Sequence, residues 1–286
     1  MDAPQEFHYR VAGRVSGQRP GSHPGLSVGV GQEFVKHISL YDRPDPRRLD
    51  LRASLRTLNS DWLVRANRQR AGITVRALVD VSASMSFGSV RPKLHVVADF
   101  VESLGMSAFR VGDAVGMMAF DQAERADLFI PARVSRGMGT IMSAALRSVT
   151  GRRNATERDG LEAIAAHLAG QQGLIFLISD FHWPLPRLNN VLDLLAHAGV
   201  VPVVVWDRAE IEPPDRNALA TLRDAESGAR RTLWVRPKLR RRWHQAVAAR
   251  RAEIDDFFAA RAIRPFYMES TFTADAMSRY FFEAET

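Results

Sequence analysis

From about residue 73 onward, short apolar runs rich in β-branched residues alternate with longer segments whose apolar residues recur with a helical period. This alternation is typical of successive βαβ units, which build a parallel sheet with both faces buried. The pattern predicts an edge strand at 126–130 and buried strands at 74–79, 114–120, 174–178 and 200–206. The predicted fold class is therefore α/β, with a mostly parallel sheet.

The segments between these strands carry their apolar residues on one helical face. In segment 93–110 that face is formed by Leu94, Val97, Ala98, Val101 and Leu104. Further helices are expected at 140–149, 160–169 and 188–198, where the last ends before a glycine. Because a parallel sheet needs helices on both faces to bury it, the sequence predicts a doubly wound arrangement.

The two ends of the chain are less regular. Beyond residue 207 the pattern predicts a hairpin around 226–228, a long basic helix at 239–260, a strand at 263–268 and a helix at 273–282. We divide the chain into four parts on these grounds. They are a mobile N-terminus rich in Gly, Pro and Arg (1–25), an N-terminal β extension packing on the core (26–72), the core domain (73–207) and a C-terminal elaboration (208–286).

Composition narrows the possible chemistry. The 286 residues include no cysteine, which excludes disulfides, thiolate metal sites and cysteine nucleophiles. A net charge of +7 favours an acidic partner, such as an acidic protein, nucleic acid or an anionic membrane surface. Residues 1–25 do not resemble a signal peptide, and no apolar run approaches the roughly 20 residues of a membrane-spanning helix. A cytoplasmic protein without membrane insertion is expected.

The most informative polar residues follow the first predicted strand of the core. Asp80, Ser82 and Ser84 alternate along an extended loop, so one carboxylate and two hydroxyls point to the same side. A second strand ends just before Asp180, and a glycine-rich turn leads to Thr140 at the start of a helix. These five residues can converge because the carboxyl ends of parallel strands share one edge of the sheet. Their oxygen atoms favour a hard cation such as Mg²⁺.

This pattern resembles a known metal site. The metal-ion-dependent adhesion site (MIDAS) of von Willebrand factor A (vWA) domains is similar in residue type, order and spacing to Asp80, Ser82, Ser84, Thr140 and Asp180. The resemblance covers about residues 73–206 and implies a doubly wound, Rossmann-like vWA fold. It also implies that Ser82 and Ser84 bind the metal directly. Asp80 and Asp180 would bind directly or through water, and Thr140 would join in one conformational state.

The segment before the core resembles a narrower bacterial group. Residues 25–34 (GLSVGVGQEF), Tyr41 and residues 45–50 (DPRRLD) are similar to the N-terminal signature of bacterial vWA proteins encoded beside MoxR-type AAA+ ATPases. Two departures stand out. The usual Pro-Gly-Asp-Asp turn is Arg-Pro-Asp-Pro at residues 43–46, and a leucine replaces the tryptophan of the usual Asp-Trp pair at residues 50–51.

The resemblance implies a function in protein interaction rather than catalysis. In this family a Glu or Asp of a partner fills the open position on Mg²⁺, or on Mn²⁺ or Ca²⁺, because an octahedral oxygen shell accepts one outside carboxylate. The MoxR-associated group implies cooperation with a MoxR-type AAA+ ATPase in the chaperone-like assembly or maturation of a client protein complex. One branch, the MxaS-like proteins, belongs to methanol dehydrogenase gene clusters, which implies maturation of that enzyme.

Each candidate residue also has an ordinary structural explanation. Ser82 or Ser84 could simply cap a helix. Thr140 could be an N-cap, and Asp180 could be a turn residue at the end of a strand. Asp121, at the end of another strand, is either an outer-shell residue or a solvated turn aspartate. The joint placement of the five residues favours the metal site over these separate explanations.

Two other functions compete with metal-dependent interaction. A phosphatase of the haloacid dehalogenase type needs a second carboxylate two residues after Asp80, where this chain has Ser82. Neither a Walker A lysine nor an HExxH pair occurs. The alternative is a nucleic-acid-binding protein, because the basic segment 236–251 places arginines around Trp243, a pattern suited to phosphate contact and base stacking. A solvated helix face explains the same residues.

Overall fold

A computed structural model describes residues 5–11, 20–29, 33–56, 61–149, 160–214, 218–223 and 230–283. The chain forms two compact units. One contains Met1–Tyr9 and Thr74–Thr286, and the other contains Arg10–Ile73. The larger unit holds the predicted core and all five predicted metal-site residues, so it is described first.

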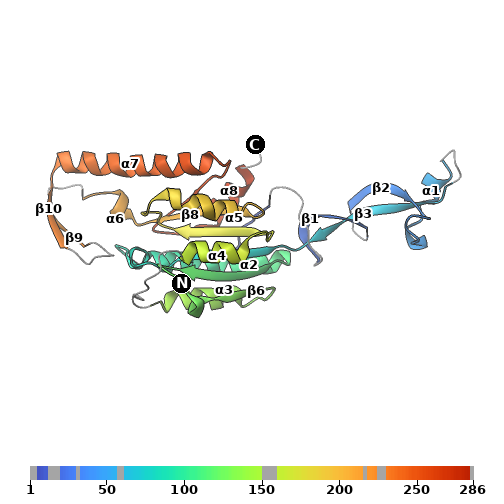
Figure 1. Cartoon of the computed structure of the whole chain (residues 1–286), viewed down its shortest axis with the longest axis horizontal. Coiled ribbons are helices and arrows are strands. Elements are labelled where there is room, and N and C mark those ends of the chain that lie inside the picture. Colours follow the sequence, from blue (N-terminus) through green and yellow to red (C-terminus); the bar gives the residue numbers. More distant parts are fainter. Residues whose placement is uncertain are drawn as a thin grey trace. The chain divides into compact units, whose positions relative to one another are not determined.

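The larger unit is built on a six-stranded sheet of order β11-β8-β7-β4-β5-β6 (Figure 1). The strands are β4 (Thr74–Asp80), β5 (Ala114–Phe120), β6 (Ile130–Arg133), β7 (Leu174–Ser179), β8 (Gly199–Trp206) and β11 (Phe266–Glu269). All neighbouring pairs are parallel except β5 with β6. The predicted mixed α/β class and the four central strands are therefore confirmed.

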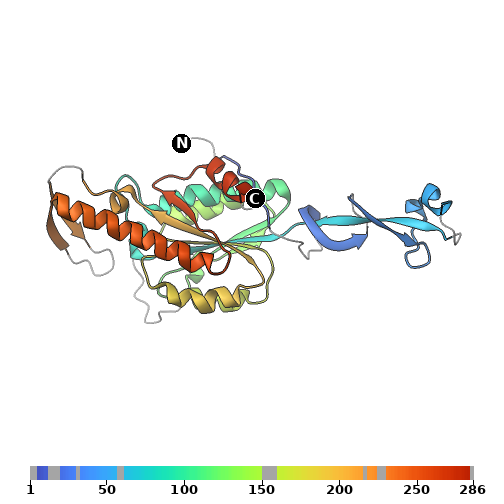
Figure 2. The same cartoon turned by 90° about the horizontal axis from the view of Figure 1, so that it is seen from above.

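Helices cover both faces of this sheet. They are α2 (Lys93–Val111), α3 (Met138–Arg147), α4 (Gly160–Leu168), α5 (Leu188–Leu194), α6 (Arg208–Ile211), α7 (Pro237–Ala259) and α8 (Ala274–Glu283). On one face, α4, α5 and the end of α7 bury their apolar residues against Ile175 and Leu177 of β7. On the other face, Phe176 contacts Phe100 of α2 and Phe281 of α8. Figure 2 shows α2 and α8 on the opposite side of the sheet from α5.

The N-terminal segment 5–9 packs into this second face. Phe7 is 2% exposed and stacks on Phe100, with ring centroids 5.8 Å apart. Its backbone N–H donates to the hydroxyl of Ser107 at 2.9 Å, and the hydroxyl of Tyr9 donates to Asp113 at 2.6 Å. These residues lie in the segment 1–25, which was predicted from the sequence to be mobile. An isolated aromatic pair carries no periodic pattern that would reveal this packing.

The predicted edge strand is present, but its predicted bounds of 126–130 are wrong. Ala126–Leu128 forms a short 3₁₀ helix, and the antiparallel edge strand β6 begins only at Ile130. The guanidinium of Arg125 holds the turn by donating to Asp127 at 2.9 and 3.0 Å and to Asp121 at 3.3 Å. This local ion-pair network favours a turn over the extended backbone that the apolar residues alone indicate.

The C-terminal part follows the predicted order of elements. Strands β9 (Ala218–Arg223) and β10 (Arg230–Val235) form an antiparallel pair, and the predicted turn around 226–228 lies outside the described residues. The basic helix α7 follows, then β11 and α8. In the part of the chain that the structure describes, no helix is both long enough and apolar enough to cross a membrane.

The smaller unit is an antiparallel sheet of order β1-β3-β2. Its elements are β1 (Pro20–Gly29), β2 (Glu33–Ser39), the 3₁₀ helix η1 (Pro46–Arg48), α1 (Leu51–Ser54) and β3 (Leu63–Ala71). Asp50 caps α1 by accepting the N–H of Ala53 at 3.0 Å, and it pairs with Arg65 at 3.0 Å. The N-terminal extension is therefore a β unit, and its packing on the core stays a prediction.

Candidate metal centre

The candidate site lies where two adjacent central strands end. Asp80 is the last residue of β4, and Asp180 follows the last residue of the neighbouring β7. Ser82 and Ser84 lie in the loop after β4 and in the 3₁₀ helix η2 (Ala83–Ser86). These four residues line one cavity of about 710 Å³. The predicted convergence at the carboxyl edge of the sheet is therefore present for four of the five residues.

Hydrogen bonds fix these side chains relative to one another. The two carboxylate oxygens of Asp80 accept from the backbone N–H of Ser82 at 2.9 Å and from the hydroxyl of Ser179 at 2.7 Å. The hydroxyl oxygens of Ser82 and Ser84 lie 3.1 Å apart, and Ser84 contributes to lowering the pKa of Asp180. Ser82 precedes η2 but makes no side-chain capping bond to it. The arrangement favours a shared polar site over a helix cap.

The structure does not bring Thr140 into this cavity. Thr140 is an exposed residue in the first turn of α3, and it is not among the residues that line the cavity. The start of α3 is held tightly against α2, because a Cβ at Gly139 would lie 2.4 Å from the backbone oxygen of Glu102. Asp121 does line the cavity, but its carboxylate binds Arg125 and the N–H of Ala123. The role of Thr140 stays a prediction.

The two carboxylates of the site repel each other. Burial, followed by the charge of Asp180, raises the pKa of Asp80 to about 6. Burial would also raise the pKa of Asp180, but the charge of Lys93 lowers it below its ordinary value. Two buried carboxylates and two hydroxyls facing one cavity are the donor set that a hard divalent cation requires. The residues present therefore fit Mg²⁺, and a bound cation would relieve the repulsion.

Lys93, His182 and Glu210 lie at this site but were not among the residues predicted from the sequence. The ammonium of Lys93 lies 2.8 Å from a carboxylate oxygen of Asp180 and 2.8 Å from one of Glu210. The Lys93 side chain is 1% exposed, although lysine is rarely buried without a partner. One signal was available: Lys93 begins helix α2, where the helix dipole disfavours a positive charge. This preference is weak, so the sequence alone does not identify the partners of Lys93.

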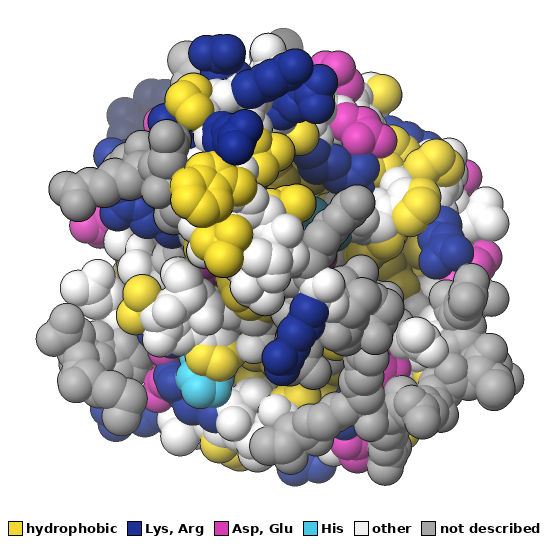
Figure 3. Space-filling model, turned by 90° about the vertical axis from the view of Figure 1, so that its left-hand side faces the viewer, with side chains coloured by type: hydrophobic (Ala, Val, Ile, Leu, Met, Phe, Trp, Pro, Cys, Tyr) yellow, Lys and Arg dark blue, Asp and Glu magenta, His cyan; other side chains and the backbone are white. Residues whose placement is uncertain are grey.

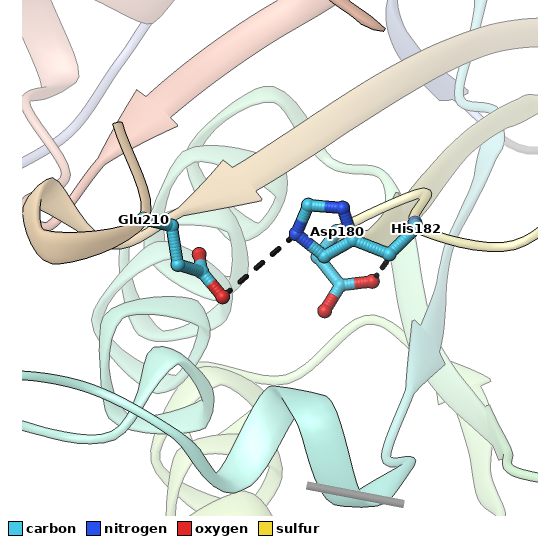
Figure 4. Close-up of side chains that lie close together, drawn as sticks. All are labelled: Asp180, His182 and Glu210. Atoms are coloured by element: carbon cyan, nitrogen blue, oxygen red, sulfur yellow. Dashed lines mark hydrogen bonds and ion pairs between the residues drawn. The ribbon is translucent and has the colours of Figure 1, made fainter. Parts of the chain in front are cut away.

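A second group of potential ligands adjoins the first. Ligand atoms of Asp180, His182 and Glu210 lie within 4.8 Å of one another and could hold a metal ion (Figure 4). Glu210 also closes a capping box at the start of α6, where it accepts the N–H of Asp207 at 2.8 Å. Lys93 binds two members of the group, so a cation bound by all three would have to displace its ammonium.

The loop that carries Asp180 has an unusual backbone. Phe181 is fully buried and has φ of 50°, a left-handed conformation that bulky residues rarely adopt. Three contacts hold it. The indole of Trp206 donates to the carbonyl of Asp180 at 2.9 Å, and the guanidinium of Arg250 donates to the carbonyls of Phe181 and Trp183. Residues of β8 and α7 therefore fix the position of a candidate metal ligand.

The basic segment 236–251 is partly committed to the fold. The indole of Trp243 donates to the carbonyl of Glu210 at 2.7 Å, and Arg250 is engaged by the loop after β7. The guanidinium of Arg251 lies 4.2 Å from the ring centroid of Tyr267 and pairs with Glu269. Arg241 and Arg242 are exposed. The tryptophan and two of the arginines assigned to nucleic-acid contact thus have structural roles.

The fold and this site define the class: an α/β protein with a candidate metal centre at the carboxyl edge of a mostly parallel sheet. Comparison with known families then identifies the group. Residues 42–253 match the family described as "Protein of unknown function DUF58". Because the match covers most of the chain, the protein belongs to this family.

Similar curated proteins include uncharacterized proteins of mycobacteria. Rv1480 of Mycobacterium tuberculosis is 28% identical over 263 residues, covering 89% of this chain and 78% of the relative. A protein of Mycobacterium bovis, Mb1516, matches with the same figures. A shorter relative from Paracoccus denitrificans is named "Uncharacterized protein in moxR 3'region". It is 31% identical over 102 residues, covering 36% of this chain and 97% of its own length.

The matches among solved structures are more distant in sequence. An aerotolerance-related membrane protein from Bacteroides fragilis has 13% identity and a TM-score of 0.43, covering 74% of this chain and 98% of that chain. BatB, a conserved hypothetical protein from Bacteroides thetaiotaomicron, has 14% identity and a TM-score of 0.42. That comparison covers 75% of this chain and 99% of BatB.

Proposed function

We propose that this protein is a metal-dependent protein-interaction module of the vWA type and not an enzyme. The observation that carries the proposal is the convergence of Asp80, Ser82, Ser84 and Asp180 on one cavity at the ends of β4 and β7. Fold alone does not imply function, so the proposal rests on the chemistry of these side chains.

The four side chains would hold Mg²⁺, or Mn²⁺ or Ca²⁺, through oxygen atoms. A bound cation supplies an open coordination position that a carboxylate from outside can fill. Neighbouring groups of the chain orient the two carboxylates. Ser179 and the backbone of Ser82 orient Asp80, while Lys93 orients Asp180. A partner's Glu or Asp would thus be recognised at a preformed anionic site only when the cation is present.

We further propose a MoxR-type AAA+ ATPase as the partner in assembling or maturing another protein complex. The name of the Paracoccus denitrificans relative supports this proposal, because it places that relative in a moxR 3' region. Maturation of methanol dehydrogenase would be one instance of such a role. A cytoplasmic location accompanies the proposal, since a MoxR-type ATPase works where ATP is available.

The test is binding of a purified MoxR-type ATPase, measured by biolayer interferometry in Mg²⁺. We use metal-site variants, and not a chelator, to remove the cation from this protein. A chelator would also remove the Mg²⁺ that the ATPase needs for its own nucleotide. Asp80→Ala and Ser84→Ala should abolish binding. Ser86→Ala is the matched control, since Ser86 is an exposed residue of the same 3₁₀ helix. Equal binding by all four proteins would overturn the metal-dependent interaction.

A further inference from the structure

Beside the metal cavity lies a second, apolar cavity, and we propose that the two together bind one segment of a partner protein. The segment would carry an acidic residue for the metal and, close to it in sequence, a large apolar side chain for the groove. This inference rests on the proposed function and deepens it, since it names the chemistry of the partner. The apolar cavity is called the α6–α7 groove below.

The α6–α7 groove has a volume of about 480 Å³. Its walls are apolar side chains from the end of β8, from α6 and from the first half of α7. The residues that make these walls are Trp206, Ile211, Leu239, Trp243, Ala246 and Val247. A cavity of this size and character takes a leucine, phenylalanine or tryptophan side chain, whose burial supplies a large part of the affinity in many interfaces.

The groove is preorganised by the same contacts that hold the metal site. Trp243 donates its indole N–H to the carbonyl of Glu210, and Trp206 donates its own to the carbonyl of Asp180. Arg250, also at the groove, holds the carbonyls of Phe181 and Trp183. Because the walls are already ordered, a ligand loses less free energy in ordering them.

His182 makes the groove and the metal cavity continuous. Its imidazole lines both cavities and stacks on Trp206, with ring centroids 6.1 Å apart. One short segment can therefore place two of its side chains in the two cavities at once. Linking two contacts in this way raises the affinity above that of either contact alone.

Charge selects an acidic segment. Arg242 lies at the groove, and within the described residues it forms no ion pair. Its neighbour Arg241 is also exposed. Near the top of Figure 3, at the height where α7 begins in Figure 1, hydrophobic side chains gather among those of Lys and Arg. An acidic peptide with an apolar anchor complements both the cationic rim and a cation held by the two aspartates.

The experiment selects peptides from a displayed random dodecapeptide library on the immobilised full chain in millimolar Mg²⁺. We expect enriched sequences that pair an Asp or Glu with a Leu, Phe or Trp a few positions away. A representative peptide, synthesised with a fluorophore, is then measured by fluorescence anisotropy against four variants.

Ala246→Arg places a long side chain over the groove from an exposed helical position, and Ala248→Arg is the matched control outside it. Ala246→Arg should weaken binding about tenfold or more, the loss expected for one buried apolar side chain. Ala248→Arg should leave it unchanged. Arg242→Glu should weaken binding more than Arg241→Glu, because only Arg242 lines the groove.

Four outcomes separate the inference from the proposed function. Mg²⁺-dependent enrichment of acidic peptides without an apolar residue would overturn the groove and leave the metal-dependent interaction in place. Apolar enrichment that persists with EDTA and with Asp80→Ala would overturn the joint site. Absence of enrichment would overturn both proposals. In the fourth outcome, a fluorescent RNA oligonucleotide binds tightly to the wild type and not to Arg242→Glu. That result would assign the cationic rim of the groove to nucleic acid and overturn the proposal of an acidic protein partner.

Discussion

The ammonium of Lys93 lies 2.8 Å from a carboxylate oxygen of Asp180, and both side chains are 1% exposed. A buried ion pair thus adjoins the cavity that also contains Asp80. Lys93 neutralises one of the two carboxylates that face each other across the site. Without a metal, the charge of the two aspartates is therefore partly balanced by Lys93. The net negative charge that attracts a cation is smaller than it would be for the two aspartates without Lys93.

Lys93→Met should strongly destabilise the metal-free protein. The substitution keeps the length of the side chain but leaves Asp180 and Glu210 without their cation, so the free energy of unfolding should fall by about 3–5 kcal/mol. Stabilisation by Mg²⁺ should at the same time become larger than in the wild type. Urea unfolding at pH 7, with EDTA and with Mg²⁺, measures both effects.

Arg91→Met is the control for this comparison. Arg91 pairs with Asp99 where both side chains are about one-third exposed (35% and 32%), so its loss should cost about 0–1 kcal/mol. Equal effects of Lys93→Met and Arg91→Met would show that the buried pair has no special role at the site.

The raised pKa of Asp80 predicts a pH dependence of stability. A folded-state pKa of about 6, above that of an unfolded aspartate, means that the folded protein binds more protons between roughly pH 4 and pH 6. The stabilisation contributed by this carboxyl is therefore complete at the acidic end of that window and is lost as the pH rises through 6. The pKa values of Asp180 and Glu210 are lowered, so their contributions are lost only below about pH 4.

The difference in unfolding free energy between wild type and Asp80→Asn isolates this effect, because other titrating groups are common to both proteins. In EDTA the wild type should lose stability relative to the variant by about 2–3 kcal/mol from pH 4 to pH 7, at 1.36 kcal/mol per pKa unit. Urea unfolding at five pH values measures the difference. A flat difference, or one of opposite sign, would contradict the burial of two facing carboxylates.

Arg250→Ala should weaken metal binding from a distance. Without its guanidinium, the carbonyls of Phe181 and Trp183 lose their partner and the left-handed backbone after Asp180 is less well held. We expect a loss of stability of about 1–3 kcal/mol and a several-fold weaker Mg²⁺ affinity. Isothermal titration calorimetry measures the affinity. Arg251→Ala serves as control, since Arg251 contacts Tyr267 and Glu269 instead, and its Mg²⁺ affinity should match the wild type.

Gly139→Ala tests the packing that positions Thr140. The new methyl group would lie 2.4 Å from a backbone oxygen of Glu102, so α3 would have to move away from α2. Overpacking of this kind costs about 1–3 kcal/mol. Gly137→Ala, where the added carbon meets nothing within 4 Å, should cost much less. Thermal unfolding of both variants measures this difference, and equal losses of stability would contradict the close packing of α3 on α2.

Much of the fold follows from local pattern. Buried parallel strands are continuous apolar runs, and this is why the strand predicted at 114–120 has the observed bounds of β5. The edge strand was misplaced because Arg125 and its acidic partners form a turn that hydrophobicity alone does not reveal. The packed segment around Phe7 depends on contacts with residues about 100 positions away, such as Ser107.

The candidate site could be predicted only in part, for a related reason. Asp80 and Asp180 lie close together because parallel strands end at the same edge of the sheet. The sequence predicts both strands, so it also predicts this proximity. Lys93 meets Glu210 across a separation of 117 residues, and this contact depends on where α6 returns to the sheet. The position of Thr140 depends on the distance between α2 and α3, which is set by glycine contacts rather than by any periodic pattern.

The metal centre is best tested by thermal unfolding of metal-stripped protein with and without millimolar Mg²⁺. A ligand that binds only the folded state must raise its melting temperature. We expect Mg²⁺ to raise the melting temperature of the wild type and of Ser86→Ala, but not that of Asp80→Ala or Ser84→Ala. No stabilisation of the wild type, or equal stabilisation of all four proteins, would contradict a metal centre at this edge of the sheet.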